Sequence, residues 1–219
     1  IARVPVPRLP VDFPEAGALV RDRATVSFEL GAEETADLFQ ILPAVYHSRI
    51  DEALLSALVR AVSGWTRSPR LRVDLEEHGR EPLFEDLDVS RTVGWFTSLY
   101  PVVLEAGDAG PGEALVSAKE RLRAVPERGI GYGLLRHLLP EAPAAEISFN
   151  YLGQVDATFD ARSLFRASSA SAGPMQSARA HRAYPLEING LVMDGRLQMV
   201  LTYGRRTHRR ETVERRAAA

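Results

Sequence analysis

Six consecutive residues that follow a predicted strand combine most of the side chains that acid–base chemistry uses. They are Glu76, Glu77, His78, Gly79, Arg80 and Glu81. In the strand, residues 71–76, apolar and charged residues alternate, so Glu76 points away from the apolar face. If another protein layer covers that opposite face, Glu76 is a partly desolvated carboxylate that can act as a base. The alternative is a solvated strand end with a weak ion pair.

A second polar pair, Asn150 and Tyr151, lies near the end of a strand predicted over residues 146–152, which Gly153 is expected to end. The two side chains offer hydrogen-bond donors where apolar residues would be expected. Two interpretations stay open for them. They bind a substrate, or Tyr151 completes the core while Asn150 bonds a turn.

Other kinds of site are not indicated. No two of the five histidines are spaced as a local ligand pair, so we expect no metal site. The sequence has no nucleophile elbow, no P-loop and no dinucleotide-binding motif, so the residues of a cofactor site, if any, stay unknown. Gly129, Gly131 and Gly133 have the wrong spacing for phosphate binding, and we expect them to let the backbone approach another element.

Composition narrows the class of protein. The chain has 219 residues, 45% of them hydrophobic, a formal net charge of −2 and no cysteine. Such a chain can bury a core without disulfides, and its charge gives no attraction to nucleic acid. Its apolar stretches are too short to span a membrane, and the lack of cysteine fits a cytoplasmic protein. It begins at Ile1 without a leader-like segment, which suggests a piece of a longer protein.

Strands and helices alternate along most of the chain. Residues 1–22 contain four prolines, Pro5, Pro7, Pro10 and Pro14, and are predicted to form an extended arm or linker before a lobe that comprises residues 23–219. Strands are predicted at residues 24–30, 71–76, 100–104, 146–152, 186–193 and 197–202, the last two as a hairpin through Asp194 and Gly195. Helices are predicted at residues 32–41, 50–65, 113–125, 134–139 and 205–216, and residues 163–180 are expected to be flexible. This order predicts an α/β or α+β fold with a mixed sheet.

Four segments together resemble the signature motifs of epimerization domains of nonribosomal peptide synthetases. They are residues 75–81, 91–101, 126–133 and 149–154, and the resemblance extends over residues 11–213. These domains are relatives of condensation domains and have the chloramphenicol-acetyltransferase-like fold. Their first lobe carries a His-His-x-x-x-Asp-Gly motif that is absent here, so the chain resembles the C-terminal lobe alone. Glu77 stands where the family pattern usually has glycine.

The resemblance implies inversion of the α-carbon of a carrier-bound aminoacyl or peptidyl thioester, from L to D. Glu76 would be one acid–base group and the histidine of the missing N-terminal lobe the other. Tyr151 and Asn150 would position the substrate or stabilise the enolate, Arg80 would hold or tune Glu76, and His78 would support the site. No tightly bound cofactor is implied, because a peptidyl carrier protein presents the substrate on its 4′-phosphopantetheine arm.

Two other functions stay open: a non-catalytic module that docks a carrier protein, and a condensation-type acyltransferase. The basic residues 205–210 also allow two interpretations. They contact an acidic carrier protein, or they belong to an exposed helix whose charge Glu211 and Glu214 balance.

Overall fold

A six-stranded mixed sheet forms the centre of the computed structural model, which describes residues 4–14, 17–107, 110–138, 144–155, 168 and 170–218. The strands follow the order β1-β6-β5-β4-β2-β3. Their bounds are β1 Arg23–Glu29, β2 Arg70–Glu77, β3 Ser98–Glu105, β4 Ile147–Gln154, β5 Leu186–Met193 and β6 Arg196–Gly204. The pairs β2–β4 and β4–β5 are parallel, whereas the other neighbours are antiparallel. The predicted mixed sheet is therefore confirmed.

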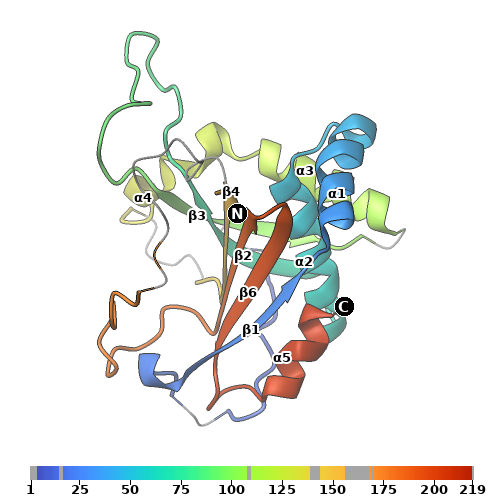
Figure 1. Cartoon of the computed structure of the whole chain (residues 1–219), viewed down its shortest axis with the longest axis vertical. Helices are drawn as coiled ribbons and strands as arrows, with labels where there is room; N and C mark the ends of the chain where they lie inside the picture. The colour runs from blue at the N-terminus through green and yellow to red at the C-terminus, as the bar shows by residue number, and fades with distance from the viewer. Residues whose placement is uncertain are drawn as a thin grey trace.

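Helices pack against one face of this sheet (Figure 1). They are α1 Ala32–Tyr46, α2 Ile50–Thr66, α3 Pro111–Arg123 and α5 Arg210–Ala217, while α4 Tyr132–Leu135 and the short 3₁₀ helices Val20–Asp22 and Pro126–Gly129 lie in the connections. Leu71, Val73 and Leu75 of β2 are all buried in the core on the helix side. Leu55 and Val59 of α2 pack into the same core. The predicted alternation of β2 is thus confirmed, and we call the sheet surface on the other side the open face.

Local signals explain where several elements begin and turn. The backbone N–H of Arg49 donates to Glu52 Oε2 at 2.8 Å, so the first turn of α2 satisfies one of its unpaired donors. The β5–β6 hairpin turns through Asp194 and Gly195, both with positive φ (52° and 69°). That geometry suits the two-residue turn that the Asp-Gly pair predicted.

Two predicted ends in the first and fourth of these elements were wrong. Helix α1 continues to Tyr46 past the predicted end at residue 41 and includes Pro43. Strand β4 does not end at Gly153 but continues to Gln154, because Gly153 (φ 76°) lies in a register shift between Tyr151 and Gln154. Such an irregularity inserts a residue without ending the strand.

The remaining differences are in the helices. The predicted helix over 205–216 begins only at Arg210, because Thr207 closes a turn on Gly204 through its backbone and its hydroxyl. Helix α3 ends at Arg123, before the predicted position, and α4 stops at Leu135 rather than continuing through 138. Residue 139 of the predicted 134–139 helix, and residues 163–167 and 169 of the segment expected to be flexible, lie outside the described residues.

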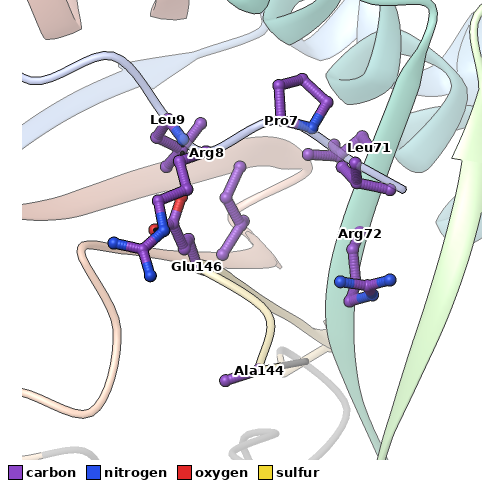
Figure 2. Close-up of a pocket in the computed structure, with 9 residues that line it drawn as sticks. Pro7, Arg8, Leu9, Leu71, Arg72, Ala144 and Glu146 are labelled. Carbon is purple, nitrogen blue, oxygen red and sulfur yellow. Dashed lines mark hydrogen bonds and ion pairs between the residues drawn. The ribbon is translucent and has the colours of Figure 1, made fainter. Parts of the chain in front are cut away.

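The N-terminal arm, residues 4–14, contains no helix or strand and lies against the body of the lobe. Figure 2 shows it crossing the start of β2, where Pro7, Arg8 and Leu9 border a cavity of about 280 Å³ together with Leu71 and Glu146. The backbone N–H of Leu9 donates to Glu146 Oε2 at 2.5 Å. On the open face, Arg72 Nη2 donates to the carbonyl of Val4 at 2.8 Å, so the arm covers part of that face.

Candidate active site

Glu76 and Asn150 lie side by side on the open face. Glu76 of β2 pairs in register with Asn150 of β4, which pairs in turn with Asn189 of β5. Because paired residues of parallel strands point to the same side of a sheet, the three side chains share one face. Both Glu76 and Asn150 are half-buried. A carboxylate beside two amides can exchange a proton with a bound group while the amides donate hydrogen bonds to it.

Asn189 is a residue that the sequence interpretation missed. The strand was predicted correctly, but nothing in the sequence indicates that β5 lies parallel to β4 with Asn189 opposite Asn150. Only the sheet order, together with the register, places the three side chains in one row.

Neighbouring groups partly cover the open face next to this row. Tyr184 donates its hydroxyl to Asp74 Oδ2 at 2.8 Å. Burial raises the pKa of Asp74, an effect that the Tyr184 hydrogen bond and the charges of Arg136 and Arg72 oppose. The condition set for Glu76, a second layer over the open face, is therefore met in part by the segment of Tyr184.

Tyr151 leaves β4 on the other side of the sheet, the helix side. It contributes to the wall of a cavity of about 190 Å³, to which both Glu76 and Glu77 also contribute. The Tyr151 hydroxyl is buried, and no described residue accepts or donates a hydrogen bond there. Burial, and secondarily the charge of Asp51, raises the pKa of Tyr151, so its phenol keeps the proton and is a donor. The structure therefore joins Tyr151 and Glu76 only through this cavity wall.

Glu77 faces the same cavity, and also a second one of about 410 Å³, from the helix side of β2. Burial is the largest cause that raises the pKa of Glu77, and Asp51 adds to it. Arg49, whose Nη2 lies 3.7 Å from Glu77 Oε1, opposes the shift, as does Arg128. Glu77 is thus a second half-buried carboxylate, one residue from Glu76 and on the opposite face.

Arg80 and His78 contact the loop that follows β2. Arg80 Nη2 donates to the carbonyl of Thr92 at 2.9 Å, Nη1 donates to the carbonyl of Val89, and the guanidinium lies 4.2 Å from the centre of the Phe96 ring. His78 Nδ1 accepts from the backbone N–H of Arg80 at 2.9 Å. These contacts support the loop over residues 82–97. The predicted influence of Arg80 on Glu76 stays a prediction.

One of the three glycines in residues 129–133 has the role that the sequence predicted. A Cβ on Gly129, at φ 75°, would lie 2.2 Å from Cγ of Tyr100, so only glycine permits this approach. The same prediction was wrong for Gly131 and Gly133, where a Cβ would meet nothing within 4 Å.

Residues 2–218 match the family model described as the condensation domain. The chain belongs to this family. Among curated proteins, it is 43% identical over 218 residues to a part of the linear gramicidin synthase of Brevibacillus parabrevis, and the match covers 95% of this chain and 3% of that protein. It is 41% identical to chondramide synthase cmdD of Chondromyces crocatus, with 97% and 6% covered. The condensation-family chain therefore spans only a few per cent of these relatives.

Solved structures give a sharper likeness. The epimerization domain from the third module of tyrocidine synthetase B superposes with a TM-score of 0.87 at 33% identity, covering 99% of this chain and 50% of that one. The X-domain from teicoplanin biosynthesis reaches 0.72 at 18% identity, with 99% and 50% covered. The EpoB cyclization-docking bidomain from Sorangium cellulosum reaches 0.68 at 13%, with 98% and 43% covered. The resemblance to epimerization domains is confirmed, and the match to half of one fits a single lobe.

Two further properties concern the described residues of this condensation-family chain. They contain no group of three or more His, Asp or Glu side chains that could hold a metal ion. None of their helices combines the length and the apolar character that crossing a bilayer requires.

Proposed function

We propose that this chain is the C-terminal lobe of an epimerization domain that converts a carrier-bound L-aminoacyl or peptidyl thioester to its D-epimer. The observation that carries the proposal is the closeness of the match to an epimerization domain, at 33% identity and a TM-score of 0.87 over nearly the whole chain. The X-domain and the cyclization domain share the fold at much lower identity. The row of Glu76, Asn150 and Asn189 supplies matching chemistry.

Epimerization needs two proton-transfer groups on opposite faces of the α-carbon. One group removes the α-proton, the electron pair moves onto the thioester oxygen to form an enolate, and the other group returns a proton to the opposite face. We assign Glu76 to one of these roles and the other to a first lobe. Asn150 and Tyr151 act as N–H and O–H donors that stabilise the enolate oxygen or orient the thioester.

Exposed apolar side chains support the need for a second lobe. The loop over residues 82–97 projects from the top of the molecule in Figure 1. Val93 and Trp95 in this loop are 99% and 89% exposed, and Phe84 and Leu87 are also exposed. Apolar groups gathered in this way mark a surface that a partner covers. Because the chain matches half of a solved epimerization domain, we assign this surface to the first lobe, with a peptidyl carrier protein bringing the substrate on its 4′-phosphopantetheine arm.

The test is α-proton exchange in deuterated water by the two-lobe domain that contains this chain, supplied with a loaded carrier protein. Because general acid–base groups contribute roughly 10²–10⁴-fold, we expect Glu76→Gln to lower the exchange rate at least about 100-fold. Tyr151→Phe should lower it as well. Glu105→Gln is the matched control, since Glu105 pairs with Arg70 at the far end of β2.

Three outcomes would contradict parts of this proposal. Carrier binding without α-proton exchange would indicate a docking module, and amide formation between two carrier-bound substrates would indicate an acyltransferase. Full exchange activity in both variants would refute the roles of Glu76 and Tyr151.

A further inference from the structure

Cations from two other elements lie at the two ends of the segment that follows Glu76. At its start, Arg49 Nη2 lies 3.7 Å from Glu77 Oε1. At its end, Arg128 Nε lies 3.7 Å from Glu81 Oε2. Arg49 belongs to the N-terminus of α2 and Arg128 to the 3₁₀ helix Pro126–Gly129. The turn through His78 and Gly79 is thus connected to two separate parts of the lobe.

Arg49 is itself held before it meets Glu77. Its Nε donates to Asp51 Oδ1 at 3.0 Å, and its Nη2 donates to Asp51 Oδ2. Its backbone N–H donates to Glu52, whose side chain is almost fully buried. A planar guanidinium fixed in this way loses little conformational freedom when it binds a second carboxylate. The contact with Glu77 therefore ties the end of β2 to the first turn of α2.

Arg128 is also held by its surroundings. Glu127 and Arg128 both have left-handed backbone conformations, with φ 44° and 46°, and Gly129 packs directly on Tyr100. Non-glycine residues adopt this conformation at a cost, and they keep it where neighbouring contacts enforce it. Arg128 therefore approaches Glu81 from a fixed backbone.

We propose that Arg49 and Arg128 are positioning residues that orient Glu76 by holding Glu77 and Glu81. Successive side chains of a strand point to opposite faces, so the pull on Glu77 toward α2 directs Glu76 toward Asn150 on the open face. The backbone between Glu76 and Glu77 has no freedom to turn while both ends of the segment are held. This role rests on the proposed epimerization, in which Glu76 transfers the proton.

The experiment uses Arg49→Met, Glu77→Gln and their double variant in the intact two-lobe domain, with Arg128→Met tested separately. We expect each single variant to lower kcat for α-proton exchange about tenfold, or about 1.4 kcal/mol, with KM within about twofold. The double variant should lose no more than a single one, because both remove the same contact. Arg49→Lys, which keeps the charge, should recover most of kcat.

Hydrogen–deuterium exchange of the amides of residues 76–81 gives a readout that needs no substrate. It should become at least about threefold faster in Arg49→Met, Glu77→Gln and Arg128→Met. The control is the exposed pair Arg196 and Glu29, 3.2 Å apart on β6 and β1, whose removal should change neither readout.

Unchanged amide exchange together with kcat within twofold of wild type would overturn the proposal. So would single effects that multiply in the double variant, because they would be independent of the contact. If the unaltered two-lobe domain exchanges no α-proton, the proposed function fails, and amide exchange alone then decides whether the two arginines hold this segment.

Discussion

Gly129 gives the sharpest test of how the backbone near the candidate site is built. Its φ is 75°, and an added Cβ would lie 2.2 Å from Cγ and Cδ1 of Tyr100 and 2.8 Å from its Cβ. Tyr100 is buried in the core between β2 and the helices, so its ring has little room to move. Gly129→Ala therefore combines a strained backbone with an overpacked core.

The size of the effect follows from these two causes. The left-handed conformation costs a residue with a Cβ roughly 1–2 kcal/mol. Overpacking a core typically costs about 1–3 kcal/mol. We expect Gly129→Ala to lower the free energy of unfolding by about 3 kcal/mol. For a chain of this length, that corresponds to a fall in Tm of about 6–12 °C.

The assay is urea unfolding of the purified 219-residue chain, followed by tryptophan fluorescence. Gly131→Ala is the matched control: two residues further on, Gly131 has φ −74° and open space where a Cβ would lie. We expect that variant to differ from wild type by less than about 1 kcal/mol, in either direction. Equal losses in the two variants, or a loss below about 1 kcal/mol for Gly129→Ala, would refute the packing argument.

Three further predictions concern stability and assembly. Burial lowers the pKa of His208, so the unfolded chain binds more protons below its ordinary pKa of about 6.5; urea midpoints should fall as the pH drops from 7 to 5, and less so in His208→Gln. Asp12 accepts from the backbone N–H of Arg209 (2.8 Å) and from Thr212 Oγ1 (3.2 Å) and so caps α5; Asp12→Ala should lower the unfolding free energy by about 1 kcal/mol, whereas a loss near zero would exclude the cap. Trp95→Ser should leave the unfolding free energy of the chain within about 0.5 kcal/mol but weaken binding to a separately produced first lobe, measured by calorimetry, and unchanged binding would argue against that interface.

Much of the fold follows from local patterns in the sequence. The alternation in β2 and the Asp-Gly turn between β5 and β6 are properties of neighbouring residues, and both predictions were confirmed. Element ends were less predictable because they depend on contacts from elsewhere. Thr207, for example, delays the start of α5 through a turn on Gly204.

The candidate site was predictable in its residue types but not in its arrangement. Glu76 and Asn150 stand out in the sequence because charged and amide groups interrupt strands. That they are neighbours depends on the parallel pairing of β2 with β4, which residues far apart in the sequence determine. The contributions of Asn189 and Arg49 depend on the same long-range placement, so no local pattern indicates them.

The core also decides which carboxylate belongs to the row on the open face. Leu75 and Phe149 pair in register between β2 and β4, and both are buried on the helix side. A shift of β2 by one residue would expose Leu75 and turn Glu77, rather than Glu76, toward Asn150, because side chains alternate with period two. Burying Leu75 and Phe149 makes that shift costly. The apolar residues beside the two motifs therefore select the functional carboxylate, although they take no part in the chemistry.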